Sequence, residues 1–163
     1  MLMDWLTALQ ELPPIAALRS SRWTYAAVNA SHITGIALLF GAIVPLDLRL
    51  VGFFRKIPIR PLARILVPIA ATGLLLAITA GSLLFSIRAV QYAGTPLFQV
   101  KLALIACGIA NALLLRKAAE WEATRQDTTD IPPRRLRAVG ALSIALWLAT
   151  IFCGRMLAFL DVD

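Results

Sequence analysis

The chain has 163 residues, of which 60% are hydrophobic and only 15% are charged. Its mean hydropathy of +0.79 exceeds that of a typical soluble domain, in which roughly half the residues are apolar. The composition therefore places the chain in the membrane class and argues against an independent soluble enzyme. The net charge of +7 is explained by basic loops that flank membrane spans, so we expect no nucleic-acid partner.

The first 22 residues are too short and too polar to span a bilayer. Leu2, Trp5, Leu6 and Leu9 recur at helical spacing, which is typical of an amphipathic helix lying along the membrane interface. The segment lacks the basic start and continuous apolar run of a signal peptide. We therefore predict an interfacial N-terminal segment over residues 1–22.

Four apolar segments follow, each long enough to cross the hydrocarbon core, which takes about 20 residues. We predict spans over residues 24–46, 65–87, 98–115 and 138–160, within one four-helix domain over 23–163. Pro68 falls in the first turn of the second predicted span, where its missing N–H costs little. The predicted fold is all-α, an integral membrane four-helix bundle with a short N-terminal interfacial amphipathic helix.

A stripe of small residues on the second span favours close helix packing. Gly73, Ala77 and Gly81 recur at a spacing of four. The same stripe is consistent with a homodimer face, so both uses stay open.

Basic residues gather in two of the connecting segments. Eleven of the sixteen lie between spans one and two or between spans three and four: Arg49, Arg55, Lys56, Arg60, Arg64, Arg116, Lys117, Arg125, Arg134, Arg135 and Arg137. Because basic loops stay on the cytoplasmic side, both termini are predicted on the other side. The predicted location is a bacterial inner membrane, with periplasmic termini.

Ionisable residues inside a span are functional candidates because they are costly to place in lipid. Three stand out: His32, which is the only histidine, Lys101 and Arg155. Each also has a structural explanation. His32 sits too deep to reach the headgroups and would hydrogen-bond a neighbouring helix, whereas the two cations would reach the headgroups. Arg155 would otherwise pair with Asp161 or Asp163.

One acidic residue, Asp47, closes the first predicted span at the end where the helix dipole disfavours it. Arg49, or a basic residue from the other basic loop, is the expected salt-bridge partner.

The sequence resembles a family of small bacterial four-helix membrane proteins designated only as a domain of unknown function. The resemblance covers "WTYAAVNASHITGIALLFGAIVPLDLRLVG", "LFQVKLALIACGIANALLL" and "ALSIALWLATIFCGRMLAF". It implies that the family's polar positions correspond to His32, Asp47, Arg49, Lys101, Asn111, Trp147 and Arg155. The family pattern also includes a second histidine after span three, where this chain reads "LLLRKAAEW" and has none.

One functional hypothesis is an accessory or anchor subunit that binds b-type haem for electron transfer. Haem in a helix bundle requires an axial ligand, small residues beside it and cations for its propionates. His32 is the candidate ligand and Gly35 lies one turn away, with Lys101 and Arg155 as the cations. Met156, or His32 of a second chain in a homodimer, is the candidate second ligand.

Other hypotheses remain open. Lys101 and Arg155 also suit a carrier or receptor for a small anionic ligand, with His32 as a proton-linked switch. Cys107, Cys153, Met156 and His32 are ligands suited to copper(I). The simplest hypothesis is that the protein is an accessory subunit of a larger membrane complex and has no chemistry of its own.

Overall fold

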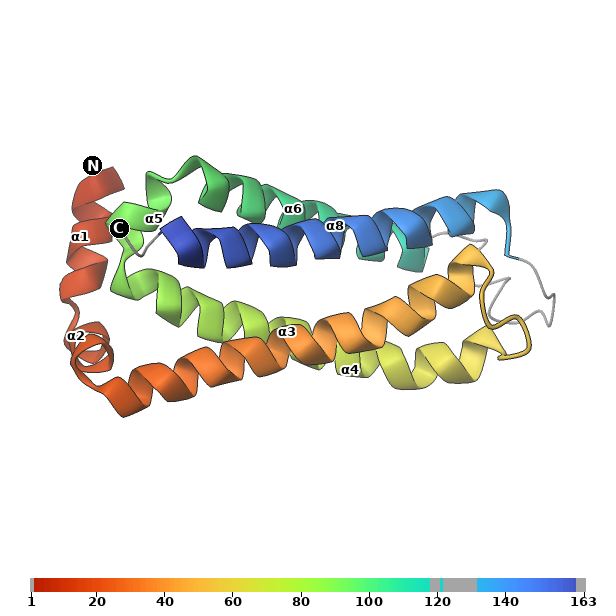
Figure 1. Ribbon diagram of the computed structural model, residues 1–163, viewed down its shortest axis with the longest axis horizontal. Helices are drawn as coiled ribbons and strands as arrows, with labels where there is room; N and C mark the ends of the chain where they lie inside the picture. The colour runs from red at the N-terminus through yellow and green to blue at the C-terminus, as the bar shows by residue number, and fades with distance from the viewer. Residues whose placement is uncertain (1, 118–120, 122–131, 161–163) are drawn as a thin grey trace. The chain divides into compact units, whose positions relative to one another are not determined.

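The computed structural model describes residues 2–117, Trp121 and residues 132–160. Every regular element in these ranges is an α-helix, as Figure 1 shows. The short helices are α1 (Leu2–Glu11), α2 (Pro13–Ser20) and α5 (Ala89–Ala93). The long helices are α3 (Arg22–Val51), α4 (Ile59–Ile87), α6 (Pro96–Lys117) and α8 (Arg134–Leu160). The all-α prediction is therefore confirmed.

The four long helices are long and apolar enough to cross a membrane, which confirms the four-span prediction. Helices of this kind imply that the protein contacts the lipid bilayer. Each helix extends beyond its predicted span because helical hydrogen bonding does not stop where the hydrocarbon ends. α3, with 30 residues, is about 45 Å long, whereas the hydrocarbon core is about 30 Å thick. Pro68 is inside α4 rather than in its first turn, so that prediction is wrong.

The chain divides into two compact units. The first contains residues 1–39 and 71–96, and the second contains residues 40–70 and 97–163. α3 and α4 each contribute one part to each unit, whereas α6 and α8 belong to the second almost entirely.

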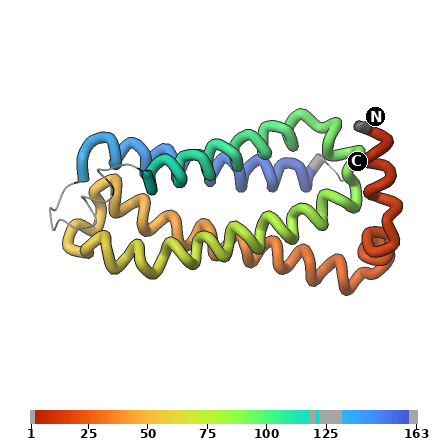
Figure 2. The backbone as a smooth tube through the Cα atoms, turned by 180° about the vertical axis from the view of Figure 1, so that it is seen from behind, coloured from red at the N-terminus to blue at the C-terminus, as the bar shows by residue number. Residues whose placement is uncertain are grey.

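In the first unit, two helices replace the predicted single amphipathic helix, because α2 begins at Pro13. Proline is favoured at the start of a helix, where the backbone N–H that it lacks would have no partner within the helix. Gln10 donates from Nε2 to the carbonyl oxygen of Ile87 at 3.1 Å. Ile15 and Leu18 are buried against Ile87. Figure 2 shows α1 and α2 beside the end of α4 and α5. The N-terminal segment is therefore packed onto the end of α4 as well as being amphipathic.

In the second unit, parts of all four long helices pack together. Leu50 of α3 is fully buried, in a cluster with residues of α4. α3 meets α8 where Gly140 faces the backbone of Asp47, and α6 meets α8 where Gly108 faces the ring of Trp147. The second unit is thus a helical bundle in which glycines bring the helices close together.

Candidate functional site

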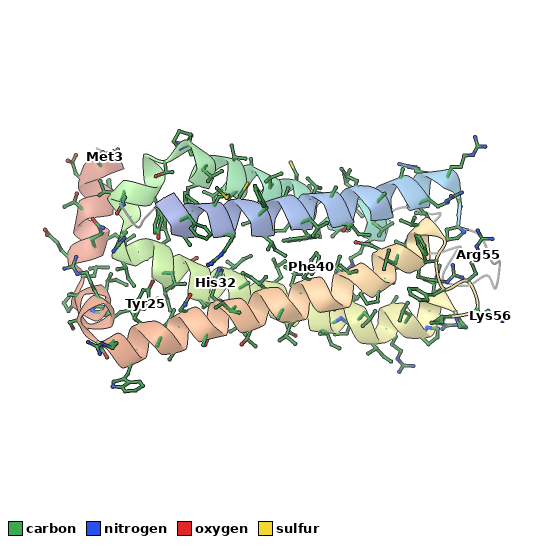
Figure 3. The ribbon with its side chains drawn as sticks, viewed as in Figure 1. Met3, Tyr25, His32, Phe40, Arg55 and Lys56 are labelled. Carbon is green, nitrogen blue, oxygen red and sulfur yellow. The ribbon has the colours of Figure 1, made fainter. Side chains whose placement is uncertain are left out.

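His32 lies on α3 in the first unit, and its ring packs against α4 (Figure 3). Imidazole Nδ1 is 2.8 Å from the carbonyl oxygen of Ala77. A carbonyl only accepts, so Nδ1 carries a proton and the lone pair of the neutral ring is on Nε2. That nitrogen is the one that binds metal ions in this tautomer. His32 therefore hydrogen-bonds a neighbouring helix, as one of the two sequence interpretations predicted.

The His32 imidazole occupies space that is available only because residue 81 is a glycine. A Cβ at this position would lie 2.9 Å from Cε1 and 3.1 Å from Nδ1 of His32. Any side chain at residue 81 would therefore displace the ring from Ala77. The sequence suggested Gly81 only as a helix-packing residue, whereas the structure makes it part of the histidine's surroundings.

Gly35 was expected to leave room for a haem beside His32, but α4 fills that space. A Cβ on Gly35 would lie 2.5 Å from the backbone nitrogen of Ala77, and one on Gly73 would lie 2.5 Å from that of Leu39. Side chains do not approach backbone so closely, and glycine is what permits this contact. The stripe of small residues is therefore used within the chain, between antiparallel segments of α3 and α4.

Lys101, Arg155 and Met156 lie in the second unit, on α6 and α8. The ammonium nitrogen of Lys101 is beside Gly154, 3.5 Å from where a Cβ would be. Arg155 is exposed, with its guanidinium carbon 4.7 Å from the centre of the Phe159 ring, whereas Asp161 and Asp163 lie outside the described residues. An anion site that uses both cations stays a prediction. Met156 is 37% exposed.

The two cysteines considered for copper lie on α6 and α8 of the second unit. Cys107 is exposed and Cys153 is half-buried, and both thiols are free. Within residues 2–117, Trp121 and residues 132–160, no group of three or more His, Cys, Asp and Glu side chains is close enough to hold a metal ion. The copper hypothesis therefore gains no support from the geometry.

A buried polar cluster in the second unit centres on Asp47 and Ser143. The carboxylate of Asp47 accepts a hydrogen bond from the Ser143 hydroxyl across α3 and α8. Its Oδ2 atom and Nε1 of Trp147, one turn further along α8, are both buried without a hydrogen-bond partner in the described structure. Nearby, Asn111 donates from Nδ2 to the carbonyl oxygen of Val139 at 3.3 Å. No pattern in the sequence indicates that Ser143 pairs with Asp47.

The predicted salt bridge between Asp47 and Arg49 is replaced by other bonds. Arg49 is 3% exposed and faces the segment that joins α3 to α4. Its Nε donates to the carbonyl oxygen of Ile57 at 2.7 Å, and one terminal nitrogen donates to that of Arg55 at 3.1 Å. Successive helix residues point in different directions, so a residue two positions away is poorly placed to pair. Arg49 thus holds the α3–α4 loop in shape.

Replacing Arg49 with methionine is expected to lower the free energy of unfolding by about 2 kcal/mol, because the bonds to charged donors are lost inside a buried site. Arg49→Lys should recover only part of this stability, since an ammonium cannot reproduce the guanidinium fork. The measurement is unfolding by SDS in mixed micelles. Arg60→Met, at an exposed position, serves as the control and should change stability by less than about 0.5 kcal/mol. Equal losses in both variants would contradict the role of Arg49.

Comparison with known proteins adds no relative, since no family model, curated protein or solved structure matches the chain. These comparisons therefore identify no family for the chain, and the resemblance noted in the sequence stays a prediction. What the sequence and the structure establish together is a multi-pass membrane protein with four candidate spanning helices and short N-terminal helices.

Proposed function

We propose that this membrane protein is an accessory or anchor subunit of a larger membrane complex, in which His32 supplies an axial ligand to a b-type haem for electron transfer. The proposed setting is the bacterial inner membrane, with the basic loops in the cytoplasm, as the positive-inside rule predicts.

The hydrogen bond from His32 Nδ1 to the Ala77 carbonyl oxygen is the observation that supports this proposal. Histidines that ligate metals almost always donate their other ring N–H to a carbonyl or carboxylate, which fixes the tautomer and the ring orientation. Here that donor is satisfied by backbone, and the ring is held against Gly81. In the neutral ring, Nε2 is then the nitrogen whose lone pair could bind iron.

A b-type haem also needs a second axial ligand. His32 is the only histidine in the chain, so a haem with two histidine ligands requires His32 from a second copy. The space between α3 and α4 at Gly35 is filled by backbone. A haem on His32 would therefore lie outside this helix pair, which favours a site completed by another chain.

The test is the visible spectrum of the full chain, purified in mild detergent from cells supplied with a haem precursor. We expect a b-type spectrum on reduction with dithionite, absent in His32→Ala and in His32→Gln. The glutamine variant retains a side-chain donor for the Ala77 carbonyl, so its loss of the spectrum would not be due to loss of that helix contact.

Gly41→Ala is the matched control, because a Cβ at residue 41 would meet nothing within 4 Å. This variant should keep the wild-type spectrum. A colourless wild-type protein, or a spectrum that survives in His32→Gln, would overturn haem ligation by His32 and leave it a helix-packing residue.

A further inference from the structure

The loop between α3 and α4 is held in a defined conformation by side-chain hydrogen bonds. The buried Arg49 bonds to two of its carbonyl groups, and the exposed Arg55 donates from Nε to Gly52 at 3.0 Å. Gly52 and Phe54 take positive φ values of 118° and 51°. The left-handed φ at a phenylalanine is unusual, which indicates that the loop has a defined backbone conformation.

Two helix N-termini meet at this loop. α4 begins directly after it, and Arg137 in the first turns of α8 donates from Nε to the carbonyl oxygen of Val51 at 3.0 Å. Neither helix has an acidic residue in its first turn. Helix N-termini carry partial positive charge. Basic side chains beside them add electrostatic repulsion, whereas a bound anion is attracted to both. The arrangement thus favours a bound anion on electrostatic grounds.

Exposed cations surround the two N-termini. We call the following set the basic loop surface: Arg55, Lys56, Arg60, Arg64, Arg134, Arg135 and Arg137, all exposed. Figure 3 shows Arg55 and Lys56 at the tip of the loop. Between residues 48 and 119 the sequence contains no aspartate or glutamate. In the described part of the second unit the only acidic residue is the buried Asp47.

Apolar side chains stand among these cations. Phe53 and Phe54 are 57% and 59% exposed, and Ile57 is also exposed. Exposed phenylalanine and isoleucine side chains beside basic residues are typical of surfaces that lie at the boundary between headgroups and acyl chains. A soluble anion would be met by the cations alone, whereas a phospholipid presents both a phosphate and acyl chains. The mixed surface therefore favours a lipid over a soluble anion.

We propose that the basic loop surface binds the headgroup of an anionic phospholipid, with its phosphate at the cations and helix N-termini and its acyl chains beside Phe53 and Phe54. This site is independent of the haem proposal, since it uses neither His32 nor any residue of the first unit. Basic clusters beside spanning helices bind anionic lipids with about 1 kcal/mol for each cation near the surface. Each cation thus contributes roughly fivefold to affinity.

The test measures lipid binding to the full chain by native mass spectrometry and by thermal stabilisation in detergent, with phosphatidylglycerol and phosphatidylcholine as probes. The wild-type protein should retain and be stabilised by phosphatidylglycerol selectively. The triple variant Lys56→Gln, Arg60→Gln, Arg64→Gln should lose affinity for it by on the order of a hundredfold at low salt. These positions are exposed, and Arg49 and Arg55 are left in place to keep the loop's shape.

The control removes the same charge from the first unit, through Arg19→Gln, Arg22→Gln and Arg88→Gln, all at exposed positions. Selective binding that survives in the control and is lost in the loop variant supports the site. Equal losses in both variants would show an effect of net charge alone and overturn it. Equal binding of the two lipids, or displacement of phosphatidylglycerol by equimolar glycerol phosphate, would also overturn it. Helical circular dichroism verifies that both variants are folded.

Discussion

Gly73→Leu is expected to separate α3 from α4 in the first unit and to cost at least about 3 kcal/mol of unfolding free energy, the upper end of what overpacking costs. A Cβ at Gly73 would lie 2.5 Å from the backbone nitrogen of Leu39 and 2.8 Å from the carbonyl oxygen of Gly35. Backbone atoms cannot move aside as a flexible side chain does, so the helices themselves must shift. The loss should appear on unfolding in SDS mixed micelles.

The control for this prediction is Gly41→Leu, on the same helix as Gly35. A Cβ at Gly41 meets nothing within 4 Å, so leucine there should be tolerated, to within about 0.5 kcal/mol. His32 provides a second readout, because its hydrogen bond to Ala77 spans the same helix pair. If Gly73→Leu were as stable as Gly41→Leu, the close contact between the two backbones would be refuted.

Trp147→Ala is expected to destabilise the second unit by roughly 3 kcal/mol. The side chain is 5% exposed, and its ring packs on Gly108, where a Cβ would be only 3.1 Å away. Lipid is as apolar as the protein interior, so the loss comes from the cavity and the missing contacts rather than from exposure to water. The quantity to measure is again the free energy of unfolding in SDS mixed micelles.

Trp147→Phe separates the size of the ring from its N–H group. Nε1 of Trp147 is buried without a hydrogen-bond partner among the described residues, and removal of such a donor relieves a desolvation cost of about 1–3 kcal/mol. Phenylalanine should therefore retain most of the wild-type stability, despite its smaller ring. A phenylalanine variant as unstable as the alanine variant would show that the N–H group has a partner.

Hydropathy was sufficient to predict the four spans and the helical class, because the length of an apolar segment is set by the bilayer. Helix ends were less predictable. α3 continues past Leu46 to Val51, since a helix can extend into the aqueous phase without any change in its hydrogen bonding. The break at Pro13 corresponds to a proline pair in the sequence, since proline is accepted in the first turn of a helix but not in its interior.

Individual polar residues were identifiable from the sequence, but their partners were not. His32 stood out because an ionisable group inside an apolar span is rare. That Ala77 accepts its hydrogen bond, and that Gly81 seats its ring, depend on how α3 and α4 are aligned. Asp47 and Ser143 are 96 positions apart in the chain, and no local pattern indicates that they pair. Arg49 was assigned to its near neighbour Asp47 by proximity in sequence, which is a poor guide on a helix.

The glycine contacts between α3 and α4 also determine how the first unit can move. Because Gly35 and Gly73 bring backbone against backbone, sliding one helix by a single residue would place a bulkier residue where only a glycine fits. Intermediate positions are closed by the same steric contact, so the two helices cannot change register gradually. The two helix segments are therefore held in one register, and this register is what keeps the His32 imidazole opposite Ala77 and Gly81.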